Sequence, residues 1–173
     1  MLSFRLHDGN TCLAIRVGSR RAVEPKDILD ELRRNFPKLI LQIISDNAVY
    51  DDEHLKWVAR QSWFAKDRVI MLAKKVELDL LMRIAGTAQI SHALKVAGAR
   101  KDEPFIILAI GEEGVVGSLF SWVKREFAII QFNKDRAIPP RLSISSKELA
   151  AVGEGKEALL LAERGLIAIL EKF

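Results

Sequence analysis

Apolar and polar positions alternate over two short runs near the start of the chain, residues 4–7 and 12–17. The three residues between the runs, Asp8-Gly9-Asn10, tolerate the left-handed backbone that a tight turn needs, so the pattern predicts a β-hairpin. Two later runs, residues 39–44 and 105–110, are almost wholly apolar and rich in isoleucine. Such runs are typical of strands that are buried on both faces.

Helical spacing of apolar residues recurs between these runs. Pro25 suits the first position of a helix, Pro37 ends it, and Thr87 is the expected N-cap of another helix. Residues 128–132 form a further expected strand, and residues 133–141 form a loop. The expected helices cover residues 25–36, 52–64, 75–85, 88–97, 118–125 and 156–170, with a short one that starts at Ser145 or Ser146.

Strands interspersed with helices predict a single domain over residues 1–173, of the α/β or α+β class. In this fold, helices pack against one central sheet that is mixed or antiparallel.

The amino-acid composition indicates which class of protein has this fold. With 49% apolar and 29% charged residues the chain is globular, and its net charge of +4 is only mildly basic. Cys12 is the only cysteine, so neither an intrachain disulfide nor a thiolate metal cluster is expected. The first ten residues lack the pattern of a signal peptide, and no apolar run is long enough to cross a membrane. We therefore expect a cytoplasmic protein.

A catalytic or cofactor site finds little support. Gly111, Gly114 and Gly117 follow an expected strand and suggest a phosphate-binding loop, but their spacing differs from the dinucleotide motif. Glu112 and Glu113 would also repel a phosphate. A flexible strand-to-helix turn is the favoured interpretation, and a small nucleotide-using enzyme is the alternative.

Metal ligands and base-stacking aromatic residues have simple structural alternatives. The acidic run that begins at Asp51 suits a helix N-terminus, and the three histidines show no paired spacing for a metal. Trp57, Trp63 and Phe64 are better explained as core residues than as stacking platforms. We therefore predict no catalytic residues, no metal and no cofactor.

Residues 74–101 hold two expected helices that meet at an uncharged joint, Gly86-Thr87. Gly86 has no side chain, and free backbone amides at the start of the second helix can bind a phosphate. Gln89 can hydrogen-bond a base edge, and Ile90 can offer it an apolar surface. Basic residues flank this joint on both sides: Lys74, Lys75, Arg83, His92, Lys95, Arg100 and Lys101.

Two features of this region have alternative interpretations. Lys75, Asp79 and Arg83 are four residues apart, which would also make a ladder of alternating charges on a helix surface. The helix expected over residues 156–170 carries more apolar residues than a one-sided surface helix needs. It is either a central core helix or a surface on which another protein packs.

The segment of residues 74–99 resembles the kinase-binding regulatory subunit of the KEOPS tRNA-modification complex, the CGI-type family of archaea and eukaryotes. The family pattern is a helix rich in Glu and Leu, a basic residue, a break, Gln-Ile, and an Ala-rich helix that closes on Gly. Ala85 and Ala88 depart from it, because the family often has Ser and Arg at these positions. The matching residues are Glu77, Leu80, Leu81, Arg83, Gly86, Gln89, Ile90, Ala93, Leu94 and Gly98.

The resemblance implies a non-catalytic, archaeal-type subunit with no small-molecule substrate. Its partners would be the small atypical kinase of the complex and the single-stranded 3′ CCA end of tRNA. The whole assembly forms threonylcarbamoyl-adenosine in tRNA. The implied RNA-binding residues are Lys74, Lys75, Arg83, Gly86, Gln89, Ile90 and Lys95, and the implied kinase-binding residues are Leu159, Leu160, Arg164 and Ile167. The alternative is a protein-interaction module that regulates a kinase and has no RNA-binding role.

Overall fold

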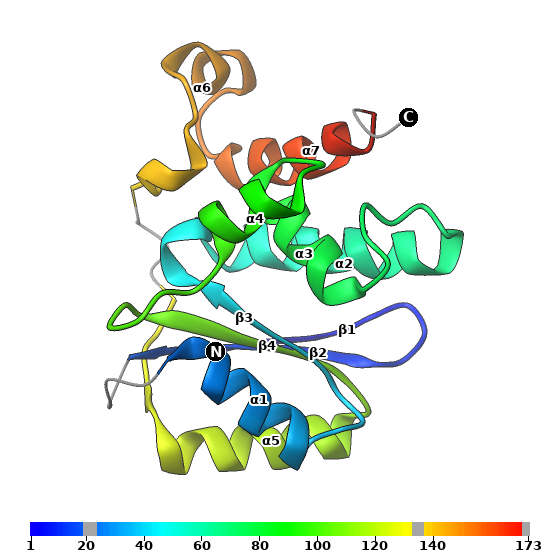
Figure 1. The fold of residues 1–173 in the computed structure, drawn as a ribbon. Helices are drawn as coiled ribbons and strands as arrows, with labels where there is room; N and C mark the ends of the chain where they lie inside the picture. The colour runs from blue at the N-terminus through cyan, green and yellow to red at the C-terminus, as the bar shows by residue number, and fades with distance from the viewer. Residues whose placement is uncertain (19–23, 133–136, 171–173) are drawn as a thin grey trace. The chain divides into compact units, whose positions relative to one another are not determined.

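A computed structural model describes residues 1–18, 24–132 and 137–170. The chain forms two compact units, which Figure 1 shows in one view. The sheet unit comprises Met1–Asp46 and Ala99–Phe132, and the helical unit comprises Asn47–Gly98 and Asn133–Phe173. Each is described by itself. The expectation that they act as a single domain stays a prediction.

In its described residues the sheet unit contains five strands, and every pairing between them is antiparallel. The order is β1-β2-β4-β3, with β5 pairing with β2 beyond that path. Leu2 lies opposite Ala14, so the expected hairpin is confirmed. With helices added, the α+β fold is confirmed as well. The strands are β1 (Leu2–Arg5), β2 (Thr11–Gly18), β3 (Ile40–Ser45), β4 (Phe105–Gly111) and β5 (Ala128–Ile129).

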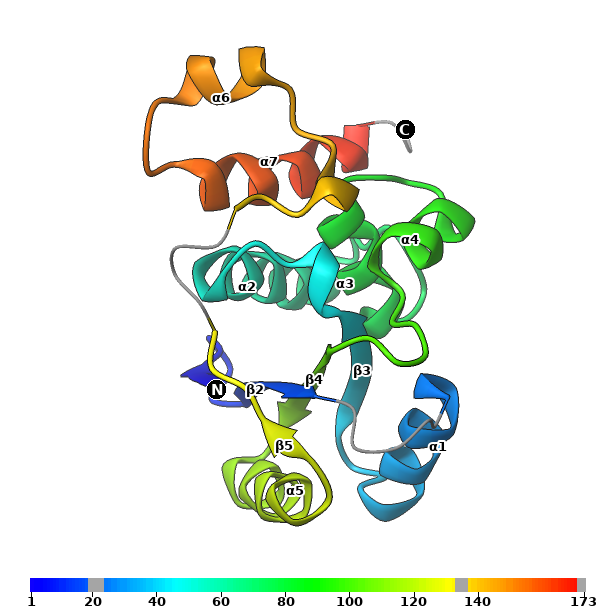
Figure 2. The ribbon, with the colours of Figure 1, turned by 90° about the vertical axis from the view of Figure 1, so that its left-hand side faces the viewer.

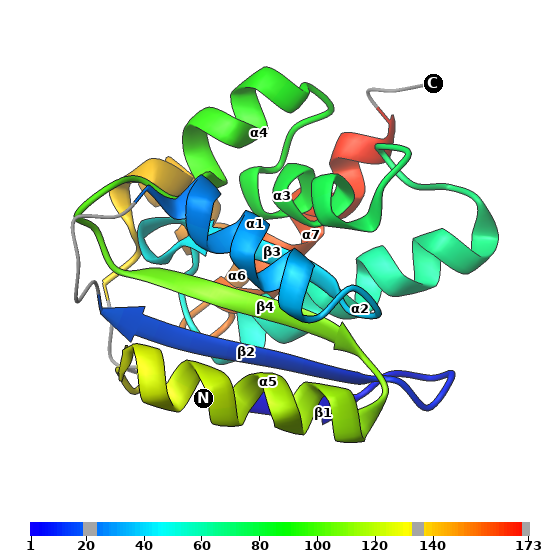
Figure 3. The same ribbon diagram turned by 60° about the horizontal axis from the view of Figure 1, so that its bottom comes forward.

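Two helices cover one face of this sheet, α1 (Pro25–Asn35) and α5 (Glu113–Glu126) (Figure 3). They bury a core with alternate residues of the strands, because successive side chains in a strand point to opposite faces. The core residues from these two helices are Ile28, Leu32, Val116, Leu119 and Val123, and those from the strands include Leu13, Ile15, Ile43, Phe105 and Ile107.

The expected glycine-rich turn after β4 is wrong. Helix α5 begins at Glu113 directly after its N-cap Glu112, so Gly114 and Gly117 lie inside the helix. A strand expected over residues 128–132 is only two residues long, and residues 133–136 of the expected loop lie outside the described residues. Gly114 and Gly117 therefore do not form a phosphate-binding loop.

The helical unit is built from five α-helices among its described residues (Figure 2). Gln61 donates to the carbonyl oxygen of Ala162 over 3.1 Å and so joins the second helix to the last. The last helix buries its small residues where it packs, among them Ala162 and Gly165. The helices are α2 (Asp52–Arg68), α3 (Val76–Ala85), α4 (Ile90–Ala97), α6 (Ser146–Val152) and α7 (Glu157–Leu170), with 3-10 turns at Asp46–Ala48 and Pro140–Leu142.

Capping explains where these helices begin. The Asp51 carboxylate accepts the His54 amide proton over 2.7 Å, which confirms the acidic run as a cap for α2. Ser145 caps α6 through a capping box with Glu148. Thr87 is not the N-cap of α4. That position is Gln89, and the Thr87 hydroxyl accepts the Gln89 amide proton over 3.2 Å.

The aromatic residues of α2 divide between core and surface. Trp63 is buried, as expected, whereas Trp57 and Phe64 are exposed. Arg68 lies over the Phe64 ring at 4.7 Å from its centroid, which is a cation–π contact at the surface. The core interpretation of this aromatic group holds for Trp63 and not for the other two.

Candidate nucleic-acid interface

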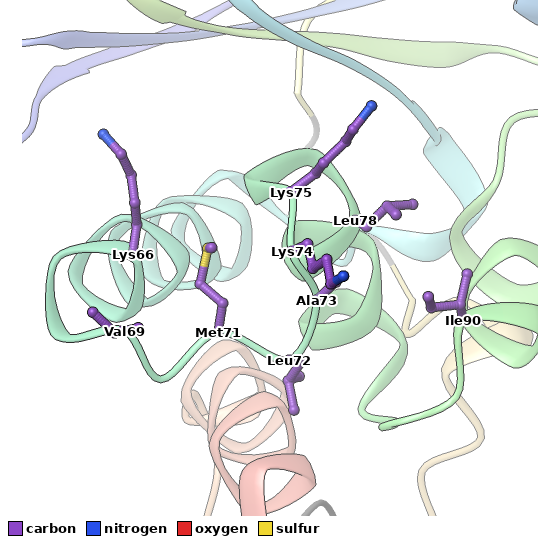
Figure 4. A pocket seen from close by; sticks show the side chains of 9 residues that line it. All are labelled: Lys66, Val69, Met71, Leu72, Ala73, Lys74, Lys75, Leu78 and Ile90. Carbon is purple, nitrogen blue, oxygen red and sulfur yellow. The ribbon is translucent and has the colours of Figure 1, made fainter.

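The helical unit carries a groove of about 670 Å³ where the end of α2, the segment before α3, and the start of α4 meet. We call it the lysine groove. Figure 4 shows its side chains, with Leu78 from α3 and Ile90 from α4 on one side. Among the described residues that line it, three are lysines and none is acidic. The lining residues are Lys66, Val69, Met71, Leu72, Ala73, Lys74, Lys75, Leu78 and Ile90.

The segment between α2 and α3 is held at both ends by hydrogen bonds that backbone amides donate. Helix α2 ends at Val69, whose φ of 58° is left-handed, and Ile70 donates to the carbonyl oxygen of Ala65 over 3.0 Å. A β-branched residue rarely adopts this backbone conformation. The Val69 side chain is also 89% exposed to solvent. At the other end, the Leu72 amide donates to the Asp79 carboxylate over 2.6 Å. Lys74 and Lys75 follow and are exposed.

Arg83 contradicts both sequence interpretations. Its side chain is fully buried, as is that of Asp79, and its Nε donates to Asp79 Oδ2 over 2.6 Å. It neither belongs to a surface charge ladder nor reaches a bound RNA. The physical reason is helix packing, because a β-carbon on Gly165 of α7 would lie 2.9 Å from the Arg83 carbonyl oxygen. The last helix therefore closes over Arg83.

Gly86 ends α3, as the expected joint predicted, and it also packs closely against α7. Its φ of 60° is left-handed, and its amide donates to the Arg83 carbonyl oxygen over 3.1 Å, which ends α3. A β-carbon at Gly86 would lie 3.2 Å from Cβ of Arg164. Gly86 lines a second cavity, of about 520 Å³, and not the lysine groove. Helix termination and close packing explain this glycine without a bound phosphate.

Gln89 and Ile90 are both exposed, and Ile90 keeps 44% of its surface accessible while it lines the lysine groove. Because α4 begins at Ile90, the amides of its first turn have no acceptor within their own helix. This helix start is positive because of the helix dipole. An apolar side chain and three lysines therefore line one groove, and the start of α4 lies at its edge.

The remaining basic residues of segment 74–101 do not line the groove. Lys95 is exposed on α4 but does not line the groove. His92 lines the second cavity, and Arg100 and Lys101 belong to the sheet unit. Of the seven predicted RNA-binding residues, the structure brings Lys74, Lys75 and Ile90 together, with Gln89 next to them.

Sequence reasoning missed six of the nine residues that line the groove, and three of them show why. Lys66 fell beyond the expected end of α2 at residue 64, whereas the helix runs to Arg68. Met71 lies in the segment between helices, where no periodicity guides a prediction. Leu78 left a signal, because it is an apolar residue of α3 outside the face of Val76, Leu80 and Ile84, which are buried.

The predicted kinase-binding residues on α7 differ in accessibility. Leu159 is exposed, Ile167 is 56% exposed and Leu160 is half-buried. Arg164 is engaged within the chain, since it donates to the Leu142 carbonyl oxygen over 2.7 Å and pairs with Glu148. Helix α7 is thus core on one face and open on another, where its exposed apolar residues are Leu159, Leu166, Ile167 and Leu170.

Two buried titratable groups lie outside this site. Burial lowers the pKa of His54 to about 4, and the ring accepts the Tyr50 amide proton on Nδ1 over 3.3 Å. Burial raises the pKa of the Cys12 thiol to about 12. In the described ranges no three His, Cys, Asp or Glu side chains gather as metal ligands would, and no helix there could cross a bilayer.

No protein-family model matches the chain, and no curated protein matches it. The resemblance to the KEOPS regulatory subunit therefore rests on the residues of segment 74–99 quoted above.

Proposed function

We propose that this protein is a non-catalytic, cytoplasmic accessory subunit of a KEOPS-type tRNA-modification complex. It binds the single-stranded 3′ CCA end of tRNA at the lysine groove and the small kinase of the complex through α7. The observation that carries the RNA part is the convergence of Lys74, Lys75 and exposed Ile90 on one groove without an acidic lining residue. No cofactor, small-molecule substrate or membrane takes part.

The groove chemistry suits the loose end of a nucleic acid strand. A base has a flat apolar face, and stacking on protein side chains is worth about 1–3 kcal/mol per base. Met71, Leu78 and Ile90 offer apolar surface for such a face. Three lysines line the same groove, and their amines can reach the phosphates that link the bases.

The start of α4 offers a second contact for the same strand. Backbone amides at a helix N-terminus bind phosphate oxygens, and the helix dipole favours the negative charge. Ile90 is both the first residue of α4 and a wall of the groove. If a phosphate of the strand binds at the start of α4, the base of the same nucleotide lies next to Ile90. Ala88, where the family often has Arg, offers no side-chain charge at this joint.

Filter binding with end-labelled tRNA tests this proposal. We expect intact tRNA to be retained and tRNA without its last three nucleotides to be lost. Each phosphate contact should contribute about −0.7 to the slope of log affinity against log salt concentration. Equal retention of the two RNAs would overturn the proposed site.

A second candidate, a kinase-regulating interaction module without RNA binding, is favoured by one observation. Helix α7 exposes four large apolar residues on the part of the chain that the structure describes, including Ile167 and Leu170. Exposed apolar surface of this kind often marks a protein contact. Capture of the kinase by a chain that retains no tRNA would favour this candidate.

A further inference from the structure

A segment of the helical unit arches away from α7 and returns to it. We call this segment, residues 139–156, the strap. It contains the turn Pro140–Leu142 and helix α6, and Figure 2 shows α6 set apart from α7 and joined to it by extended chain. None of the residues of α6 is buried. Leu142 anchors the start of the strap, since it is buried. Helical stability in proteins comes mostly from packing, so packing contributes little to keeping α6 in place.

One side chain of α7 attaches the strap. The Arg164 guanidinium donates to the carbonyl oxygens of Leu142 and Ser143 over 2.7 and 3.3 Å. It also pairs with the Glu148 carboxylate of α6 over 2.5 Å. Hydrogen bonds from the Ser145 hydroxyl and amide, together with Arg164, hold the pKa of Glu148 at about 2. The carboxylate is therefore charged at any physiological pH.

Space remains under the strap on both sides of this attachment. A cavity of about 290 Å³ lies between α6 and α7 and is lined by Val152 of the strap and by Leu159 and Leu160 of α7. The cavity of about 520 Å³ described above is lined by Ser143 and Glu148 of the strap and by Ile167 of α7. The strap thus borders the α7 residues assigned to a protein partner without packing tightly on them.

Two glycines with a left-handed backbone lie at the C-terminal end of the strap. Gly153 and Gly155 have φ values of 81° and 77°, a left-handed backbone that residues with side chains rarely adopt. No atom would lie within 4 Å of a β-carbon at either position. Close packing therefore does not explain these glycines, and their left-handed backbone does.

We propose that the strap is a displaceable cover over α7 and that the Arg164–Glu148 pair is its latch. This proposal rests on the proposed role of α7 in binding a protein partner. In the closed form the strap limits access to Leu160, which is half-buried, and a partner that docks there displaces it. The apparent dissociation constant then equals the intrinsic one divided by the open fraction, so a weaker latch strengthens binding. Arg164 is a positioning residue for the strap.

Glu148→Gln is the decisive variant, because Gln keeps the capping box of α6 and removes the charge that pairs with Arg164. Glu154→Gln is the matched control, since it makes the same charge change on the same strap without touching the latch. Both are made in the full chain, alone and with Leu160→Cys as a reporter under the strap. Cys12 is buried and contributes little background labelling.

Iodoacetamide labelling of the reporter and amide exchange of α6 are measured without any partner, and circular dichroism confirms folding. We expect Glu148→Gln to raise both rates severalfold, and Glu154→Gln to change neither. A reporter at Leu166, which lines neither strap cavity, should label equally in all backgrounds. Unchanged labelling of the Leu160 reporter in Glu148→Gln would overturn the cover.

Titration against the purified small kinase completes the test. We expect Glu148→Gln to bind the kinase severalfold more tightly than the unmodified chain. Faster labelling with equal or weaker kinase binding would overturn the displacement step. If neither the unmodified chain nor the variant binds the kinase, the proposed function of α7 is refuted. The labelling experiment uses no partner, so it still tests the latch by itself.

Discussion

Asp79 and Arg83 form an ion pair over 2.6 Å in which neither side chain is accessible to solvent. The Asp79 carboxylate also accepts the Leu72 amide proton, so one buried residue joins the segment that walls the lysine groove to the body of α3. The pair therefore holds the segment before α3 in place. Because it is buried, it is not a contact for a ligand in the lysine groove.

Replacing Arg83 by Met should destabilise the protein by about 3–5 kcal/mol, because it leaves the Asp79 carboxylate buried without its counter-charge. The measurement is the free energy of unfolding in urea. Lys74→Met, at an exposed position, is the control and should stay close to the unmodified chain. If Arg83→Met lowers the free energy of unfolding by less than about 1 kcal/mol, the ion pair behaves as one on the surface. That result would contradict the burial of Asp79 and Arg83.

Gly165→Ala should cost about 1–3 kcal/mol, because the added carbon would lie 2.9 Å from both Cβ and the carbonyl oxygen of Arg83. Gly117→Ala in α5 is the matched control, since no atom lies within 4 Å of the added carbon. That control should stabilise the chain by about 0.5–1 kcal/mol through helix propensity. Thermal or urea unfolding of both variants measures the difference, and equal effects would contradict the close crossing of α7 and α3.

Stability should fall as the pH falls from about 6.5 toward 4, through the burial of His54. The pKa of His54 is lowered from 6.5 to about 4, so within this window the unfolded chain binds a proton that the folded chain does not. Unfolding free energies at about pH 6.5 and 5 should differ by roughly 1–2 kcal/mol from this group. His54→Gln should flatten that part of the profile, and an unchanged slope would assign it to other groups.

Ile90→Glu should abolish retention of tRNA, because it places a carboxylate where a base and its phosphate are proposed to lie. Leu94→Glu is the control, since Leu94 is 50% exposed on the same helix and does not line the groove. Filter binding and circular dichroism of both variants give the result. The site is wrong if the two variants lose tRNA binding equally while both remain folded.

Ile167→Glu should weaken capture of the small kinase by at least tenfold, the loss of about 1.4 kcal/mol that one buried apolar contact supplies. The side chain is 56% exposed, so the folded chain should tolerate the change. Pull-down titration measures the affinity, and retention of tRNA serves as the control for folding. Full kinase capture by this variant would place the interface on another surface.

Local sequence was sufficient for most elements. The alternation around Asp8-Gly9-Asn10 predicted the hairpin, and the isoleucine-rich runs predicted β3 and β4, because these patterns depend only on neighbouring residues. The start of α5 was misplaced by the glycines after β4. Gly114 and Gly117 are poor helix formers, yet helix α5 includes both, since its apolar residues bury against the sheet.

The sequence by itself determined the class of fold, the order of its elements, and the place of Gln89 and Ile90 at the start of a helix. Only the tertiary structure decided which charges belong to that site. A spacing of four between Asp79 and Arg83 is the same on a surface and in a core, and Gly165, far along the chain, closes over the pair. Lys66 and Leu78 join Ile90 in one groove for the same reason. Burial and proximity depend on packing between distant segments, which no local pattern encodes.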